Sequence, residues 1–224
     1  MSVAHETHHP HLQHHFDDLE QQFEASALGM WIFLVTEILF FGGLFTAYMI
    51  YRMQYPQAFA EASAHLDIVL GGVNTAVLIG SSLTMAMAVW AAQQGRRLPQ
   101  VGYLLATIGL GLVFLGIKAV EYSHKFHDGL VPGPNFRFDG LDAIHAQLFY
   151  SLYFVMTGLH ALHMVVGIGI MAVLTWMAWQ GRFTKGYHTP VEVSGLYWHF
   201  VDIVWIFLFP LLYLIDRHGP ATMH

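Results

Sequence analysis

The sequence predicts an all-α integral membrane protein, a bundle of five transmembrane helices with a disordered, histidine-rich N-terminal tail. Of its 224 residues, 55% are hydrophobic and 11% are charged. A soluble domain carries about 25% charged residues because its surface faces water. Five apolar stretches also reach the roughly 20 residues that are needed to cross the hydrocarbon core of a bilayer, and the mean hydropathy is +0.49.

The five stretches are separated by turn-forming or charged segments. They cover residues 27–54, 66–94, 99–126, 142–180 and 190–216. Asp67, Pro99, Asp142 and Pro190 stand near the expected starts of four helices, where a capping aspartate or a first-turn proline is favoured. We therefore expect a polar tail (residues 1–26), one five-helix membrane domain (27–216) and a short C-terminal tail (217–224).

The stretch 142–180 is longer than a membrane requires, because about 38 residues make a helix of roughly 57 Å. Two short helices are the alternative, but the stretch has no proline and no polar cluster that would form a turn. We expect one long helix that protrudes on one side. Trp176 and Trp179 then mark one membrane interface, and Tyr150 and Tyr153 mark the other.

The N-terminal tail has no lysine or arginine, so it lacks the basic region of a secretory signal, and the first apolar segment is expected to remain as a helix. The tail contains His5, His8, His9, His11, His14 and His15. These side chains could capture a divalent metal, but we favour a solvated tail whose charge responds to pH. The absence of cysteine excludes disulfides and iron–sulfur clusters, and no basic patch for nucleic acid is present.

Charge specifies the orientation only weakly. With five spans, one side holds Arg96, Arg97, Arg182 and Lys185, and the other holds Arg52, Lys125, Arg137 and Arg217. The two sides therefore carry equal numbers of basic residues, and the positive-inside rule does not decide. The two shortest loops, each with two basic residues, favour a cytoplasmic N-terminus and a C-terminus on the outer side of a bacterial plasma (inner) membrane.

Ionisable side chains inside a span are costly, so each is a candidate functional residue. The candidates are Glu37, His160, His163, His199 and Asp202 as a buried polar network, and Lys118 with Glu121 as an interface polar pair. The two histidines of the fourth span are three residues apart, which predicts that they share a helix face. The lysine lies near a helix end, where it can pair with the glutamate or extend to the interface.

Three interpretations of the buried polar network remain open. The histidines could ligate haem or copper, although a cytochrome b site needs paired histidines from two helices at two depths. Glu37 and the histidines could form a proton relay. We favour polar groups that satisfy one another between helices, at about 0.6–2 kcal/mol for each hydrogen bond. Glu37 is then expected inside the bundle, protonated or bonded to His160 or His163, and no catalytic, cofactor or metal-binding residue is assigned.

Two further features concern packing and lipid. Gly102, Gly109 and Gly116 recur every seven residues, which suggests a seam for close helix approach. The loop after the fourth span offers candidate contacts to a phospholipid headgroup, because cations and tryptophan favour that depth. These candidates are Trp179, Arg182, Lys185 and His188. The alternative is that the loop only fixes the topology.

Five segments resemble, in order, successive helices of cytochrome c oxidase subunit III. They are GMWIFLVTEILFFGGLF, LGGVNTAVLIGSS, GIKAVEY, TGLHALHMVVG and VEVSGLYWHFVDIVWIFLF. The resemblance runs from about residue 27 to residue 216. The glutamate that this family buries corresponds to Glu37, and its GxHxxHxxxG pattern corresponds to His160 and His163.

The resemblance implies a non-catalytic subunit of a proton-pumping haem–copper respiratory oxidase. Such a subunit packs on the catalytic subunit I, with subunit II nearby, binds phospholipid in an internal cleft and supports proton uptake. Haem and copper are then expected in the partner subunits, and cytochrome c is contacted only indirectly. Longer members of the family have seven helices, and this chain begins where their third would.

Other identities stay open on the sequence alone. Subunit III of a quinol oxidase and the accessory subunit of nitric oxide reductase are also five-helix types. Glu37 and the Glu121–Tyr122 pair favour the cytochrome c branch. Outside the family, a small transporter is disfavoured because the spans lack internal repeats and carry only Pro210 as an internal proline. A haem b protein is the remaining alternative.

Overall fold

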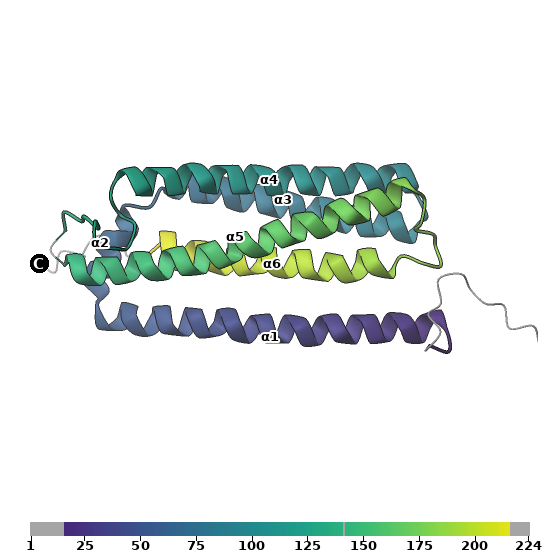
Figure 1. Cartoon of the computed structure of the whole chain (residues 1–224), viewed down its shortest axis with the longest axis horizontal. Helices are drawn as coiled ribbons and strands as arrows, with labels where there is room; N and C mark the ends of the chain where they lie inside the picture. Colours follow the sequence, from purple (N-terminus) through teal and green to yellow (C-terminus); the bar gives the residue numbers. More distant parts are fainter. Residues whose placement is uncertain (1–15, 141, 216–224) are drawn as a thin grey trace, which may run out of the picture.

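The computed structural model describes residues 16–140 and 142–215 and shows a bundle of helices that run side by side (Figure 1). The helices are α1 (Leu19–Gln54), α2 (Pro56–Ala64), α3 (Ile68–Gln93), α4 (Arg97–His127), α5 (Ala143–Trp179) and α6 (Thr189–Tyr213). Five of the described helices are long and apolar enough to cross a membrane. The prediction of an all-α protein with five transmembrane helices is confirmed, and so is the single long helix over the fourth stretch.

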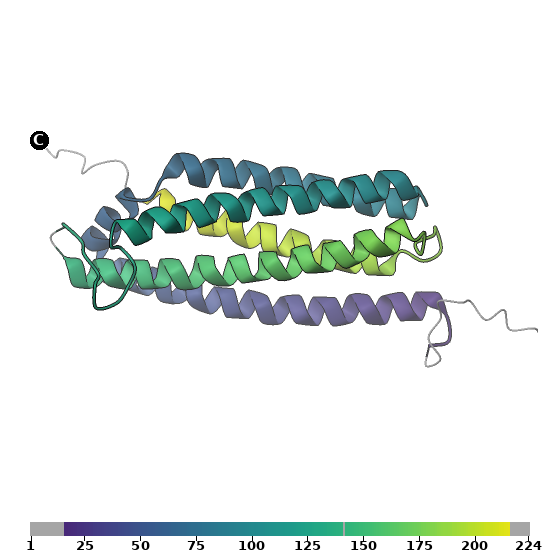
Figure 2. The same ribbon diagram turned by 45° about the horizontal axis from the view of Figure 1, so that its top comes forward.

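Helices α3 and α4 form an antiparallel pair on one side of the bundle, and α5 and α6 lie in the middle (Figures 1 and 2). Helix α1 lies on the opposite side, against α5 and α6. Its buried residues are Leu34, Phe41 and Tyr48, one in every seven. Most of α1 therefore faces outward, and a single narrow stripe holds it to the rest of the chain.

Local sequence explains where the helices begin and end. The Asp67 carboxylate caps α3 by accepting hydrogen bonds from two backbone N–H groups, and the Asp142 carboxylate caps α5 in the same way with one. Helices α3, α4 and α5 are each followed by a glycine with positive φ: Gly95 (66°), Gly129 (71°) and Gly181 (75°). Only glycine adopts this backbone conformation without strain, so these three helices stop where the sequence predicts a break.

The start of α1 differs from the expectation. Helix α1 begins at Leu19, eight residues before the expected start at 27. The Asp18 side chain accepts a hydrogen bond from the Gln21 backbone N–H at 2.7 Å, and Glu20 lies in the first turn, where the helix dipole favours an acidic residue. Polar residues thus extend the helix beyond its apolar part. The rest of the N-terminal tail, with its six histidines, and the C-terminal tail lie outside the described residues.

The short helix α2 was not expected, because the sequence around Pro56 indicated only a break. Proline occupies the first turn of α2, where its missing N–H has no helical partner to lose. Phe59 is fully buried and packs edge-on against Tyr48 and Phe149, at ring-centroid distances of 5.4 and 5.5 Å. Helix α2 therefore closes the end of the bundle where α1 stops and α5 begins.

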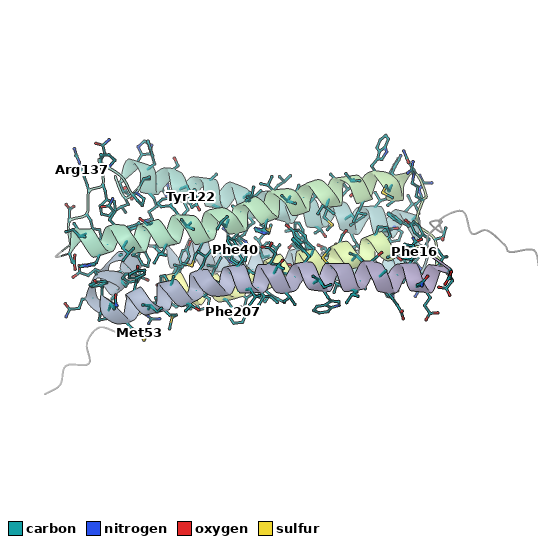
Figure 3. All side chains as sticks on the ribbon, turned by 60° about the horizontal axis from the view of Figure 1, so that its bottom comes forward. Phe16, Phe40, Met53, Tyr122, Arg137 and Phe207 are labelled. Carbon is teal, nitrogen blue, oxygen red and sulfur yellow. The ribbon has the colours of Figure 1, made fainter. Side chains whose placement is uncertain are left out.

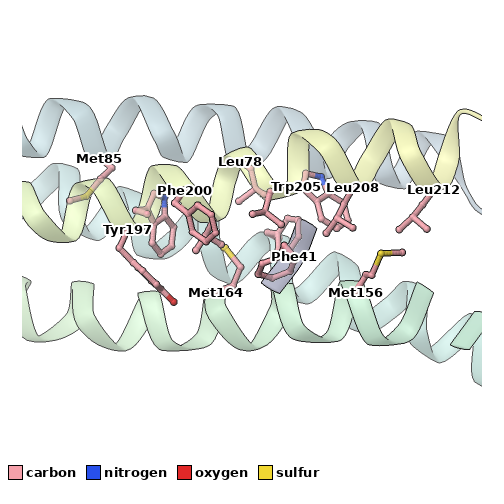
Figure 4. Packing of buried hydrophobic residues seen from close by; sticks show 14 of the residues in the cluster. Phe41, Leu78, Met85, Met156, Met164, Tyr197, Phe200, Trp205, Leu208 and Leu212 are labelled. Carbon is pink, nitrogen blue, oxygen red and sulfur yellow. The ribbon is translucent and has the colours of Figure 1, made fainter. Parts of the chain in front are cut away.

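The core of the bundle is centred on α6. Figure 4 shows Phe200 and Trp205 of α6 together with Phe41 of α1 in the space between α5 and α6. The Phe41 and Phe200 rings meet at 6.3 Å in an edge-on arrangement. Trp198 and Trp205 are both fully buried, so α6 contributes the two largest side chains of the core.

The expected glycine seam does not pack inside this chain. A Cβ atom added at Gly102, Gly109 or Gly116 would meet no atom within 4 Å, because these three residues face outward. Close approach occurs instead at Gly111 and Gly167, where an added Cβ would lie 3.0 Å from ring carbons of Trp198. The seven-residue spacing correctly predicted a common face, but packing of the large indole selected a different face for contact.

The aromatic markers of the two membrane interfaces give a mixed outcome. Trp176 and Trp179 are exposed at one end of α5, as an interface residue requires. Tyr150 and Tyr153 are fully buried inside the bundle, so neither ring faces lipid, and their depth in the membrane stays a prediction. The rings of Phe136 and Phe138, from the loop before α5, lie 5.9 and 6.5 Å from the Tyr150 ring. This loop therefore covers the Tyr150 ring at the end of the bundle.

Candidate functional site

Glu37 of α1 and His163 of α5 form a polar contact between two spanning helices. Glu37 Oε2 lies 3.2 Å from His163 Nε2, and both side chains are only partly buried, at 19% and 17% exposure. His163 Nδ1 lies 2.8 Å from the Leu159 carbonyl oxygen. A carbonyl can only accept, so Nδ1 carries a proton and Nε2 faces the carboxyl group. One further proton is then shared between Glu37 and His163, either as a neutral pair or as an ion pair.

Two aromatic side chains hold His163 in place. The Phe41 ring packs edge-on against the imidazole, with ring centroids 5.4 Å apart. The Tyr197 hydroxyl donates to the His163 carbonyl oxygen at 3.0 Å, and its ring stacks on the imidazole at 6.5 Å. Helix α1 meets both α5 and α6 here, and the Glu37–His163 pair lies at this junction. Glu37 lies in the bundle against His163, not His160.

His160 has a different environment from His163. It is buried, and its ring lies between Phe114 of α4 and Trp205 of α6, at centroid distances of 5.3 and 5.2 Å. Neither ring nitrogen has a hydrogen-bond partner within the described part of the chain. A step of three residues rotates the side chain by about 60° around the helix. That rotation separates the two histidines, which were expected to share one network.

His199 and Asp202 of α6 face α3. His199 Nδ1 lies 2.7 Å from the Ser82 hydroxyl. Asp202 is 3% exposed, and Ser82 lies next to its carboxyl group. No hydrogen bond to either carboxylate oxygen is formed within residues 16–140 and 142–215. The expected buried polar network is therefore three separate groups: the Glu37–His163 pair, the aromatic site around His160, and the Ser82–His199–Asp202 group.

Lys118 and Glu121 form the most complete polar network in the described bundle interior. Lys118 Nζ donates to Glu121 Oε2 at 3.0 Å and to the hydroxyl oxygens of Tyr153 and Tyr213 at 3.0 Å each. Both tyrosine hydroxyls in turn donate to Glu121 Oε1, at 2.7 and 2.5 Å. The Lys118 ammonium also lies 5.3 Å from the centre of the Trp205 ring.

The expected pairing of Lys118 with Glu121 is present, but the pair is buried inside the bundle instead of extending to the surface, and its depth in the membrane stays a prediction. The two residues are only 3% and 2% exposed. Helices α5 and α6 each supply a tyrosine hydroxyl, and these hydroxyls give the charges hydrogen bonds that water would otherwise provide. Nothing in the sequence near Tyr153 or Tyr213 signalled this role, because the two residues lie 35 and 95 positions from Lys118.

The four candidate lipid contacts lie at the end of the bundle where α1 begins (Figure 1). Trp179, Arg182 and Lys185 are exposed. His188 is half-buried, and its Nε2 lies 3.2 Å from Glu192 Oε1, so it faces α6. The sequence reasoning missed Arg97, whose guanidinium lies 5.9 Å from the centre of the Trp179 ring. The signal was present, because Arg97 follows a predicted helix break at the same membrane surface.

The described ionisable residues of the spans lie in separate groups. Within the described ranges, no group of three or more His, Asp or Glu side chains is placed to hold a metal ion. His160 faces aromatic rings, His163 faces Glu37, and His199 faces Ser82. What these groups can do chemically is to hold helices together and, at Glu37–His163, to share a proton at a partly accessible position.

The fold and its polar groups define a multi-pass membrane helix bundle whose ionisable side chains are paired between helices. Comparison with protein families gives this class a name. The family model of cytochrome c oxidase subunit III matches residues 13–216. The chain therefore belongs to the cytochrome c oxidase subunit III family, the family expected from its helix segments, and is a subunit III of a haem–copper oxidase.

Individual relatives agree with this assignment. Cytochrome c oxidase subunit 3 of Synechocystis is 36% identical, over 84% of this chain and 74% of the relative. That of Thermostichus vulcanus is 32% identical, over 90% and 92%. Cytochrome bo(3) ubiquinol oxidase subunit 3 of Pseudomonas aeruginosa is 28% identical, over 96% and 94%. A subunit of this kind functions in a complex with other oxidase subunits.

Proposed function

We propose that this chain is the non-catalytic subunit III of a proton-pumping respiratory oxidase that receives electrons from cytochrome c. In this proposal subunit I carries out oxygen reduction, and subunits I and II hold the haem and copper. Cytochrome c docks elsewhere in the complex. The relatives named cytochrome c oxidase subunit 3 reach 36% and 32% identity, whereas a ubiquinol oxidase subunit 3 reaches 28%. This difference supports the cytochrome c branch.

The Glu37–His163 pair is the observation on which the functional role depends. A carboxyl group and an imidazole share one proton there, and both remain partly exposed. Glu37 lies in the middle of α1, so this exposed side faces lipid or a neighbouring oxidase subunit rather than water. We infer that the pair exchanges a proton with its surroundings and helps to keep proton uptake by subunit I efficient over many turnovers. Phe41 and Tyr197 fix the imidazole so that the exchange occurs at Nε2.

The test is Glu37→Gln in the intact oxidase. The amide keeps the size of the side chain but cannot exchange the proton. Haem content and initial turnover should stay near wild type, while the number of protons pumped per electron, or the activity kept over repeated turnovers, should fall. Glu24→Gln is the matched control, because Glu24 is exposed on the same helix. Immediate loss of turnover at normal haem content would show a catalytic role and refute the proposal.

A quinol oxidase is the second candidate, supported by the Pseudomonas aeruginosa relative, which aligns over 96% of this chain. Electron donor choice lies outside this subunit. The purified complex should therefore be assayed for oxygen consumption with reduced cytochrome c and, separately, with a quinol. Turnover with cytochrome c alone supports the first candidate, and turnover with quinol alone supports the second.

We also propose that Arg182 and Lys185 bind the headgroup of an anionic phospholipid, at a cytoplasmic surface where α1 also begins. Both side chains are exposed beside Trp179, and each cation near the headgroups contributes about 1 kcal/mol. Replacing both with glutamine should reduce the anionic lipid retained by the purified complex and weaken association with subunit I. Arg52→Gln and Arg137→Gln at the other end are the controls. Unchanged lipid content in quantitative mass spectrometry would refute this proposal.

A further inference from the structure

Asp202 is a buried carboxyl group in the middle of a membrane helix, and the Ser82 hydroxyl beside it already contacts His199. Both carboxylate oxygens lack a hydrogen-bond partner within the described residues, and the residue is 3% exposed. Asp202 is thirteen residues after the start of α6 at Thr189 and eleven before its end at Tyr213. At about 1.5 Å per residue, it lies roughly 20 and 17 Å from the two ends of the helix. This position is close to the centre of a hydrocarbon layer about 30 Å thick.

The carboxyl group lines a pocket that opens on the outer face of the bundle between α3 and α6. The pocket has a volume of about 420 Å³, and its polar lining consists of Ser82, His199 and Asp202. Ser82 is 2.7 Å from His199 Nδ1. The rest of the lining is apolar and includes Ile79, Leu83, Ile203 and Ile206. A small polar centre is thus surrounded by apolar side chains.

We propose that the α3–α6 face is the docking surface for a transmembrane helix of another oxidase subunit, and that this helix presents a hydrogen-bond donor side chain to Asp202. The proposal rests on the function proposed above. An unpartnered carboxyl group is unfavourable at this depth, because the hydrocarbon offers no hydrogen bonds. A donor such as lysine, arginine, asparagine, serine or threonine supplies the missing partner. The partner helix is therefore expected to carry a hydrogen-bond donor opposite Asp202.

Depth distinguishes a protein helix from a phospholipid at this face. A phospholipid headgroup stays about 15 Å from the centre of a hydrocarbon layer about 30 Å thick. Only its acyl chains can reach Asp202, and these have no donor. A transmembrane helix can present a polar side chain at any depth. The isoleucines and leucine around the pocket are exposed by 46–64%, and they supply the apolar contact that surrounds a buried polar contact in a stable interface.

Site-directed cross-linking in the intact oxidase tests the proposal. The chain contains no cysteine, so a single cysteine can carry a benzophenone label without background from this subunit. Ile203→Cys places the label beside Asp202, and Val166→Cys on the outer face of α5 is the matched control, because the two side chains are 50% and 49% exposed. After illumination in native membranes, the label at position 203 should give a covalent product with another oxidase subunit. Peptide mass spectrometry should place the attachment in a transmembrane helix that carries a donor side chain.

The role of Asp202 is tested by repeating the experiment in two backgrounds. Asp202→Leu should reduce the subunit product at position 203 at least fivefold, whereas Asp202→Asn, which can still accept a hydrogen bond, should retain most of it. The product at position 166 should stay the same in both backgrounds, which shows that the chain still inserts and folds. A label at position 203 that yields only phospholipid adducts overturns the proposal. So does a yield that Asp202→Leu leaves unchanged.

The same preparation separates this inference from the proposed function. If the tagged chain co-purifies with a haem–copper subunit but position 203 contacts only lipid, the docking inference fails and the proposed function stands. If no haem–copper subunit co-purifies with the chain, the proposed function itself fails. Co-purification together with a product at position 203 that depends on Asp202 supports both.

Discussion

Loss of one partner of the Lys118–Glu121 network should strongly destabilise this bundle. Lys118 donates to one carboxylate and two tyrosine hydroxyls, and Glu121 accepts from the ammonium and both hydroxyls. The bond between Lys118 and Glu121 lies within α4, and the other four bonds join α4 to α5 or α6. Removing one partner of a buried ion pair leaves an uncompensated charge and costs about 3–5 kcal/mol. We expect that loss in the free energy of unfolding for Lys118→Met and for Glu121→Gln.

The double variant gives the sharper test. Lys118→Met with Glu121→Gln leaves no unpaired charge, so it should be less destabilising than the sum of the two single variants, by about 2 kcal/mol or more. Unfolding of the purified chain can be followed by tryptophan fluorescence in an SDS titration, because Trp205 lies 5.3 Å from the Lys118 ammonium.

The control for this cycle is an ion pair that water can reach. His145 and Asp142 contact each other with side chains that are 30% and 42% exposed, and exposed pairs contribute little to stability. His145→Gln should therefore leave the unfolding midpoint close to wild type. A loss below about 1 kcal/mol for both buried single variants, or an additive double variant, would refute the view that the pair is a tightly coupled buried unit.

Two further predictions concern the helix ends and the glycines. The pKa of Asp142 is lowered because the His145 side chain and backbone N–H bond its carboxylate. Its capping contribution is therefore present above the ordinary aspartate pKa of about 3.9 and is lost as the pH falls through the lowered pKa. In an NMR titration of the Asp142 carboxyl carbon, His145→Ala should raise that pKa, and an unchanged pKa would contradict the assignment. Gly111→Ala should destabilise the chain by about 1–3 kcal/mol through overpacking against Trp198. Gly109→Ala, two residues away with open space, should be neutral or stabilising in the same unfolding assay.

Local sequence was sufficient for the number of spans and for most of their ends. Length and apolar composition identify a membrane helix, since the bilayer sets both requirements. Helix ends were predictable because they depend on neighbouring residues: the carboxylate caps at Asp67 and Asp142, and the positive-φ glycines at positions 95 and 181. Such signals did not reveal α2, whose nine residues pack against distant side chains such as Tyr48 and Phe149.

Which face of each helix packs inside was not readable from the pattern. Lipid and protein core both accept apolar side chains, so a membrane helix is apolar on every side and carries little amphipathic signal. The outward-facing glycines of α4 illustrate this point, and so does Figure 3, where large side chains such as Phe40, Met53 and Phe207 project from the outer surface of α1 and α6. Rotation of each helix about its axis is decided by contacts with distant residues.

For the polar groups, too, the sequence predicted one part and the tertiary structure decided the other. The sequence by itself determined which ionisable residues lie within spans, and it placed Glu37 near a histidine of the fourth span. Only the tertiary structure decided that this histidine is His163, that His160 lies among aromatic rings, and that Lys118 and Glu121 are buried with hydroxyls from two other helices. The physical reason is that the cost of burying an ionisable side chain depends on that residue alone, whereas its hydrogen-bond partner can come from a distant part of the sequence. A charge in hydrocarbon is costly wherever it stands, but its partner comes from whichever helix packs beside it.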